Sequence, residues 1–209
     1  VYCQGGAGFG SRGPAGPSGW IGRAIRDYRI VLLDQRGTGL STPVLSETLA
    51  RLGSAHAQAE YLQHFRADNI VRDAEHIRRE LIGDDQWSVL GQSFGGFCVT
   101  RYLSAAPDGL REAMITGGIP PVGRHPDDFY RATYQRMLDR NARYYARYPG
   151  DRDVVRRIAA RLEAGNTLLP DGTPLTVRRL QQLGMLLGAH DGFERLHFGF
   201  GEAFAGAPD

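Results

Sequence analysis

The most informative stretch of the sequence is Trp87-Ser88-Val89-Leu90-Gly91-Gln92-Ser93-Phe94-Gly95-Gly96. It opens with a short apolar run that has the length and composition of a buried strand. The run leads directly into Gly-x-Ser-x-Gly, and residues 97–103 beyond it have helical spacing. A strand, a sharp turn and a helix in this order are the context of a nucleophile elbow, in which a serine is presented above a sheet.

Ser93, the central residue of this motif, is therefore a candidate nucleophile. We expect it to hold a strained backbone conformation with its hydroxyl exposed. Gly91 and Gly95 suit such a turn because a side chain at either position would strike the neighbouring backbone. The following helix would direct its N-terminal amides toward the same place, where they stabilise negative charge. The alternative is a glycine-rich turn between strand and helix that carries no chemistry.

Length and composition describe an ordinary globular chain with room for one sizeable core and a second, smaller unit. The 209 residues are 42% hydrophobic and 23% charged. The formal net charge is only +2, so we expect neither nucleic acid nor a membrane surface as a partner. No apolar run reaches the length of a membrane span and no leader pattern opens the sequence, which makes the cytoplasm the default compartment.

The two cysteines, Cys3 and Cys98, each lie in an apolar segment and have no metal-ligand spacing. We expect both thiols to be reduced and to pack as small hydrophobic side chains. Because both residues flank the predicted site, a disulfide between them is the alternative.

Strand and helix patterns alternate in the first half of the chain. Strands are predicted over residues 1–4, 29–34, 87–90 and 113–118, and helices over 20–25, 54–83 and 97–103, with Gly83 ending the second helix. This alternation predicts a doubly wound α/β sheet of parallel strands joined by right-handed crossovers.

Two loops follow predicted strands at their carboxyl ends, where open α/β sheets build their sites. Residues 5–11 are rich in glycine and fit an oxyanion loop, in which a backbone N–H approaches a substrate oxygen. A flexible linker is the other interpretation, whereas a phosphate loop lacks both G-x-G-x-x-G and the Walker lysine. In the second loop, 34–43, Asp34 and Arg36 could be catalytic, but we favour a structural pairing that fixes the loop.

From about Pro120 the sequence pattern becomes helical throughout. Helices are predicted over 127–148, 151–162, 176–187 and 193–204, with Thr176 as a cap and a turn at 169–174. Since no strands alternate with these helices, we expect a helical unit standing over the sheet. The predicted domains are a core over residues 1–119 and a helical cap over residues 120–209.

Three motifs taken together resemble the proline iminopeptidases, serine peptidases of the α/β-hydrolase fold that remove an N-terminal proline from peptides. They are Gln4-Gly5-Gly6-Ala7-Gly8-Phe9-Gly10, Asp34-Gln35-Arg36-Gly37-Thr38-Gly39-Leu40-Ser41 and Gly91-Gln92-Ser93-Phe94-Gly95-Gly96. The helical half is also similar to the longer branch of that family at Arg143-Tyr144-Tyr145 and at Gly192-Phe193-Glu194-Arg195-Leu196-His197.

The resemblance implies a partial α/β-hydrolase fold with a helical cap, and a role for specific residues. Ser93 matches the family nucleophile, and the backbone N–H groups of Gly6 and Phe94 match the oxyanion hole. Acidic residues of the family's cap bind the free α-amino group of the substrate, and Glu194 and Glu202 are the candidates here. The implied partner is a small peptide with an N-terminal proline, and no cofactor or metal is expected because acyl transfer at serine needs none. The oligomeric state stays open.

The resemblance also implies an aspartate and a histidine on strand ends beyond the cap, and two strands before Val1. The sequence ends in or just after the predicted cap, so we expect a fragment that carries the nucleophile without its base. His190, Asp191 and His197 lie in helical sequence and are poor members of a catalytic triad. We therefore expect little activity from these 209 residues alone. Two further readings stay open: another serine hydrolase acting on esters, lactones or amides, and a non-catalytic protein built on a truncated hydrolase.

Overall fold

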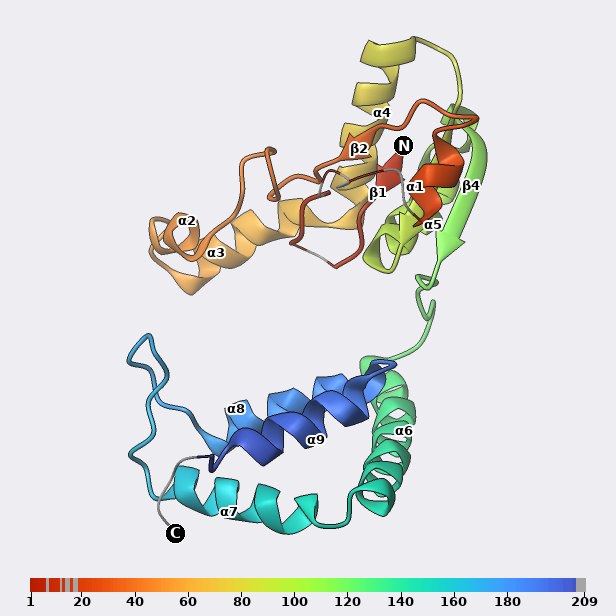
Figure 1. Ribbon diagram of the computed structural model, residues 1–209. Coiled ribbons are helices and arrows are strands. Elements are labelled where there is room, and N and C mark those ends of the chain that lie inside the picture. The colour runs from red at the N-terminus through yellow and green to blue at the C-terminus, as the bar shows by residue number, and fades with distance from the viewer. Residues whose placement is uncertain (7, 12, 14–15, 17–18, 206–209) are drawn as a thin grey trace. The chain divides into compact units, whose positions relative to one another are not determined.

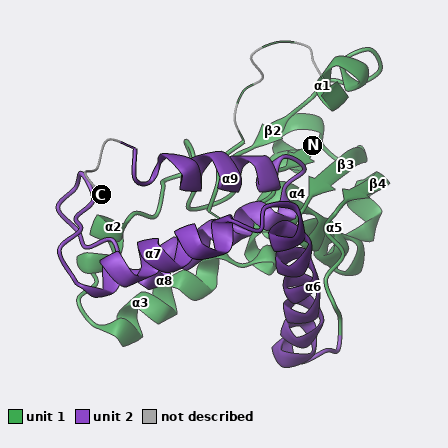
Figure 2. Ribbon diagram, turned by 60° about the horizontal axis from the view of Figure 1, so that its bottom comes forward, with its two compact units in different colours: residues 1–122 green, residues 123–209 purple. Residues whose placement is uncertain are grey.

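A computed structural model describes residues 1–6, 8–11, 13, 16 and 19–205 of the chain. Ala7, which belongs to the first glycine-rich motif, lies outside the described residues. The chain divides into two compact units, residues 1–122 and residues 123–209 (Figure 2). The assignment of the second unit as a cap, with a boundary at residue 120, stays a prediction.

The first unit contains every strand of the described chain and alternates them with helices (Figure 1). Its elements are β1 (Tyr2–Cys3), α1 (Gly19–Ala24), β2 (Leu32–Leu33), α2 (Ser46–Ala50), α3 (Ala55–Leu62), the 3-10 helix η1 (Gln63–Phe65), α4 (Ala67–Ile82), β3 (Trp87–Gln92), α5 (Phe94–Ala105), the 3-10 helix η2 (Pro107–Gly109) and β4 (Leu110–Thr116). The second unit is helical. Its elements are α6 (Pro126–Arg147), α7 (Asp151–Glu163), α8 (Val177–Gln182), the 3-10 helix η3 (Leu183–Gly188) and α9 (Gly192–Glu202).

The four strands form one parallel sheet in the order β2-β1-β3-β4, which confirms the predicted α/β class. In register, Cys3 of β1 lies opposite Leu33 of β2 and Gly91 of β3. Because the strands are parallel, the residues that follow them emerge at one edge of the sheet. The register therefore brings the loops after Cys3 and Leu33 to the same edge as Ser93.

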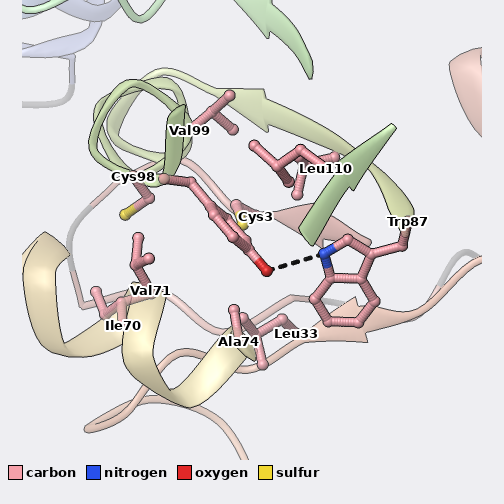
Figure 3. Packing of buried hydrophobic residues seen from close by; sticks show 11 residues of the cluster. Cys3, Leu33, Ile70, Val71, Ala74, Trp87, Cys98, Val99 and Leu110 are labelled. Atoms are coloured by element: carbon pink, nitrogen blue, oxygen red, sulfur yellow. Dashed lines mark hydrogen bonds between the residues drawn. The ribbon is translucent and has the colours of Figure 1, made fainter. Parts of the chain in front are cut away.

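The main core lies where α4 and α5 pack against the sheet, on one of its faces (Figure 3). Its buried residues are Cys3, Leu33, Ile70, Val71, Ala74, Trp87, Val89, Cys98, Val99, Tyr102 and Leu110. The apolar positions of α4 recur at helical spacing, so that one face of the helix is buried. Most of its charged residues are exposed, but Arg78 is buried and is paired with Glu75. Cys3 and Cys98 are both free thiols within this core, as predicted.

Several predicted elements differ from the structure in their bounds. The strand expected over 1–4 covers Tyr2–Cys3, the strand expected over 113–118 covers Leu110–Thr116, and the helix expected over 176–187 continues as a 3-10 helix after Gln182.

Two further elements differ more strongly. The strand expected over residues 29–34 is reduced to Leu32 and Leu33. The single helix expected over 54–83 is interrupted between α3 and α4, where Arg66 takes an extended conformation with φ −93° and ψ 166°. The guanidinium of Arg36 donates a hydrogen bond of 3.0 Å to the carbonyl oxygen of His64, which replaces a partner lost at the interruption.

The helix ends follow the sequence signals more closely. Gly83 ends α4 with a positive φ of 63°, a conformation that glycine adopts without a steric penalty. Thr176 caps α8, because its hydroxyl accepts a hydrogen bond of 3.3 Å from the backbone N–H of Arg179. Among the described residues, no helix combines the length and apolar character that crossing a membrane requires.

Candidate active site

Ser93 lies at the turn between β3 and α5. Its backbone has φ 53° and ψ −118°, a strained combination for a residue with a side chain. Two hydrogen bonds of 2.9 Å fix it: its N–H donates to the carbonyl of Thr116 in β4, and its carbonyl accepts from the N–H of Gly96. The Ser93 side chain is exposed. This is the conformation that the Gly-x-Ser-x-Gly motif predicts.

The elbow is crowded around its glycines. A Cβ added to Gly95 would collide with the carbonyl oxygen of Cys3 in β1, and one added to Gly91 would collide with the carbonyl oxygen of Gly95. Both approaches involve backbone atoms that cannot be rotated aside. The two glycines therefore let α5 start directly over the ends of β1 and β3.

The loop after β1 passes directly beside Ser93. A Cβ on Gly5 would lie 2.6 Å from the carbonyl oxygen of Gln92 and 2.8 Å from the Cβ of Ser93. Gly6 follows with φ 70°, and its carbonyl accepts a hydrogen bond of 3.0 Å from the N–H of Phe9. The contact places Gly5 of the first glycine-rich motif against Ser93, although the two residues are almost ninety positions apart in the sequence.

Two amides at this point have no hydrogen-bond partner among the residues that the structure describes. Within the described part of the chain, neither the N–H of Gly6 nor that of Phe94 donates to a backbone or side-chain acceptor. Phe94 is the first residue of α5, where the helix dipole adds positive character to the amide. Unpaired amides beside an exposed serine suit an oxygen that gains negative charge during acyl transfer. The oxyanion role of Gly6 and Phe94 stays a prediction.

The loop after β2 differs from the expected arrangement, because Asp34 and Arg36 do not pair with each other. Arg36 donates two hydrogen bonds to the carboxylate of Asp73 in α4, through Nε at 2.7 Å and Nη2 at 2.5 Å. Asp34 instead accepts two backbone N–H groups, from Ser11 and Leu40. Both residues fix the loop, as the favoured interpretation holds, but through different partners.

The two acidic candidates for amine binding both lie on α9 of the second unit. Glu194 is in its first turn and forms an ion pair with Arg147, with 2.6 Å between Oε1 and Nη2. Glu202 is the last residue of the helix and is exposed, and no ion pair of its carboxylate occurs among the described residues. The carboxylate of Glu202 is therefore the more available of the two.

A buried polar cluster in the second unit has no counterpart in the sequence-based predictions. The Asp151 carboxylate, at the start of α7, accepts a hydrogen bond from the Tyr144 hydroxyl and contacts Nδ1 of His197 at 3.0 Å. The His197 ring stacks on Tyr148 with 4.0 Å between centroids. Burial, reinforced by the bond to Asp151, raises the pKa of Tyr144. The cluster links α6, α7 and α9, so His197 has a structural role in its own unit.

Within the described residues, no group of three or more histidine, cysteine, aspartate or glutamate side chains is arranged to hold a metal ion.

Three features of the first unit agree with a single known fold. They are the strand order of the sheet, the strained serine after β3 and the glycine-rich loop beside that serine. A family model described as alpha/beta hydrolase fold matches residues 1–164, and the chain belongs to that family.

The chain is also similar in sequence to individual proteins. Over 206 residues the chain is 52% identical to a proline iminopeptidase of Aeromonas sobria, a match that covers 99% of this chain and 48% of that protein. It is 41% identical over 203 residues to a proline iminopeptidase of Aspergillus aculeatus, with 94% of this chain and 45% of that protein covered. A proline iminopeptidase of Xanthomonas citri is 35% identical over 92 residues, which are 44% of this chain and 24% of that protein.

These matches confirm the resemblance that the three motifs indicate. The chain spans about half the length of the two relatives that it matches almost throughout.

Proposed function

We propose that the polypeptide carrying this chain is a serine aminopeptidase that releases N-terminal proline from peptides. The observation that carries the proposal is the strained, exposed Ser93 beside the amides of Gly6 and Phe94, for which the described residues supply no acceptor. The two relatives that match the chain almost end to end are named proline iminopeptidases, which supports a peptide with an N-terminal proline as the substrate.

The chemistry follows from the positions of these groups. The Oγ of Ser93 attacks the carbonyl carbon of the prolyl residue, and its proton passes through a general base to the leaving amine. The carbonyl oxygen becomes an anion that accepts hydrogen bonds from the N–H groups of Gly6 and Phe94. The C–N bond then breaks to leave a prolyl ester on Ser93. Water hydrolyses this ester, which frees proline and restores the hydroxyl.

The test is hydrolysis of a chromogenic prolyl amide by the full-length natural polypeptide, with Ser93→Ala beside it. We expect the substitution to lower kcat by about 10⁶-fold, the loss found when a nucleophilic serine is removed. Ser88→Ala is the matched control, since the Ser88 hydroxyl bonds to Glu112 at the far end of β3. N-acetylation of the substrate should abolish turnover, because it removes the free amine.

Other outcomes would point to the other functions. Turnover of simple esters that depends on Ser93, without turnover of the prolyl amide, would indicate a broader serine hydrolase. No turnover of either substrate by the full-length polypeptide would favour a non-catalytic protein on a hydrolase fold.

The role of the acidic residues on α9 is a separate part of the proposal. We assign recognition of the substrate's amine to Glu202 in preference to Glu194, because the carboxylate of Glu194 already forms an ion pair with Arg147. Glu202→Gln should raise KM for the prolyl amide by about tenfold with little change in kcat, since it removes ground-state binding. Glu194→Gln serves as the comparison, and an equal KM for both variants and the unmodified protein would reject the assignment.

Residues 1–209 on their own should be a poor catalyst. No imidazole of the described residues makes a hydrogen bond with Ser93, and a serine hydroxyl without such a base is a weak nucleophile. Robust release of proline by the isolated 209-residue chain would contradict this part of the proposal.

A further inference from the structure

The loop after β2 holds the far end of the glycine-rich loop through one carboxylate. Oδ1 of Asp34 accepts the backbone N–H of Ser11 at 2.7 Å, and Oδ2 accepts the N–H of Leu40 at 2.8 Å. The Ser11 hydroxyl donates to the carbonyl of Leu33 at 2.9 Å. A Cβ on Gly10 would lie 2.9 Å from Oδ1 of Asp34, so the loop backbone lies directly against this carboxylate.

The near end of the glycine-rich loop is held by the next residue of the same motif. Nε2 of Gln35 donates a hydrogen bond of 3.1 Å to the carbonyl oxygen of Gln4, the residue before Gly5 and Gly6. The Gln35 side chain is only 3% exposed, and the Thr38 hydroxyl binds its backbone carbonyl at 2.7 Å. Burying an amide side chain is costly unless it is paired, so this contact fixes both partners.

The loop after β2, which carries Asp34 and Gln35, is attached to helix α4. The neighbouring Arg36 reaches α4 and binds the Asp73 carboxylate through two nitrogens, a geometry that restricts the direction of both side chains. The loop after β2 is therefore attached to the core helix, and the glycine-rich loop is attached to it at both ends.

We propose that Asp34 and Gln35 are positioning residues that set the Gly6 N–H at the oxyanion site beside Ser93. This inference rests on the proposed function. A loop with glycine at positions 5, 6, 8 and 10 has wide conformational freedom, and the strand before it has only two residues. A donor stabilises an oxyanion only when it is held at the position that the charged oxygen will occupy. Because Gln4 and Ser11 are both held by hydrogen bonds, Gly6 between them has fewer positions open to it, and its N–H is kept at the oxyanion site.

The test uses the full-length natural polypeptide with Gln35→Met and Asp34→Asn. Methionine has nearly the volume of glutamine and lacks the donor to Gln4. Gln86→Met is the matched control, because Gln86 makes the same kind of bond, from Nε2 to the carbonyl of Asp108 at 2.9 Å, at the opposite end of β3. Ser11→Ala is a milder variant that removes only the bond to Leu33, should the other two fail to fold.

Two measurements separate positioning from a purely structural role. The first is the split between kcat and KM for the prolyl amide. The second is the affinity for proline boronic acid, which forms a tetrahedral adduct at the serine with an oxygen at the oxyanion site, relative to the affinity for proline itself. We expect kcat to fall about 10- to 100-fold, somewhat less than when a whole oxyanion donor is removed, with KM within about twofold. Boronate affinity should fall in parallel, while proline affinity and the control variant stay unchanged.

Equal kcat and an equal ratio of the two affinities in folded Gln35→Met, Asp34→Asn and unmodified protein would overturn the inference. A parallel loss of boronate and proline affinity would overturn it too, since that pattern indicates general distortion. If the unmodified protein neither turned over the amide nor bound the boronate at Ser93, the proposed function itself would be wrong.

Discussion

The backbone of Ser93 shows how a single position is held in an unfavourable conformation. Its φ of 53° costs on the order of 1–3 kcal/mol, and it persists because the bond to Thr116 and the start of α5 determine it. The sequence predicts this conformation because Gly-x-Ser-x-Gly after an apolar run has few other structural solutions. The partner Thr116 is not predictable in the same way, since it depends on the register of β4 against β3.

The crowding at Gly95 gives a prediction at the scale of one residue. Gly95→Ala should lower the free energy of unfolding by about 1–3 kcal/mol, because the new methyl group would strike the carbonyl of Cys3. Gly199→Ala on α9, where a Cβ would meet nothing within 4 Å, should raise it by about 0.5–1 kcal/mol. Urea unfolding measures both, and the same sign for the two variants would contradict the packing described here.

The buried thiols give a second prediction. Burial raises the pKa of Cys3 to about 11 and that of Cys98 to about 12. Because the thiolate is the reactive form, neither thiol should react with iodoacetamide at pH 8 in the folded protein, and both should react in denaturant. Intact-mass measurement counts the added groups. Rapid labelling of the folded protein would show that the core around these residues is open.

At the scale of elements, a charged network joins α4 to α5. Glu75 receives two hydrogen bonds from Arg78 and one from the Tyr102 hydroxyl, and Tyr102 in turn accepts a bond of 3.0 Å from Nε1 of Trp87, drawn as the dashed line in Figure 3. Hydrogen bonding to Arg78 holds the pKa of Glu75 below its ordinary value, partly offset by burial.

The lowered pKa of Glu75 fixes the sign of a pH dependence. A carboxylate with a depressed folded-state pKa contributes stability above its ordinary pKa of about 4.3, and this is lost as the pH falls through the folded value. Glu75→Gln should therefore cost about 3 kcal/mol at pH 7, with the difference narrowing below about pH 4. Glu80→Gln, at an exposed position of the same helix, is the control. Thermal unfolding across pH measures this, and a constant difference down to pH 2 would refute it.

Helix positions were predicted more accurately from sequence than strand lengths or helix breaks. The apolar spacing in α4 and the glycine that ends it act within one element, so they are visible in the sequence. The break before α4 is stabilised by Arg36, which is more than twenty positions away, and no local pattern reveals it. β2 is limited to two residues because its only neighbour among the described strands, β1, offers partners to Leu32 and Leu33 alone, although the Val31 carbonyl also accepts a hydrogen bond of 2.9 Å from the N–H of Tyr2.

At the scale of the whole molecule, the chain consists of two units joined by a segment outside any helix or strand. Between β4 and α6, Ile119 and Val122 are about four-fifths exposed, and Arg124 is exposed as well. Trypsin should cleave early after Arg124, because an exposed loop reaches a protease more readily than a helix does. Mass spectrometry of the first fragments tests this, with Arg124→Gln as the control. Early cleavage within α6 with the Arg124 bond intact would contradict the division.

The candidate site was predictable only where chemistry depends on a contiguous motif. Ser93, Gly6 and Phe94 each belong to such a motif, and the resemblance indicates their roles. Gln35 was missed although it lies in the second motif, because its only signal is that a buried amide needs a partner. The structural contact between Asp151 and His197 in the second unit could not be predicted, because the two residues are 46 positions apart and only the packing of α7 against α9 brings them together.

The most direct test of the central claim is to trap the acyl group on the nucleophile. The full-length polypeptide is mixed with an activated prolyl ester, quenched in acid and digested, and the peptides are measured by mass spectrometry. We predict that the peptide containing Ser93 gains the mass of one prolyl residue, and that Ser93→Ala shows no modified peptide. A prolyl group found on another residue, or ester turnover that persists unchanged in Ser93→Ala, would contradict the assignment of Ser93 as the nucleophile.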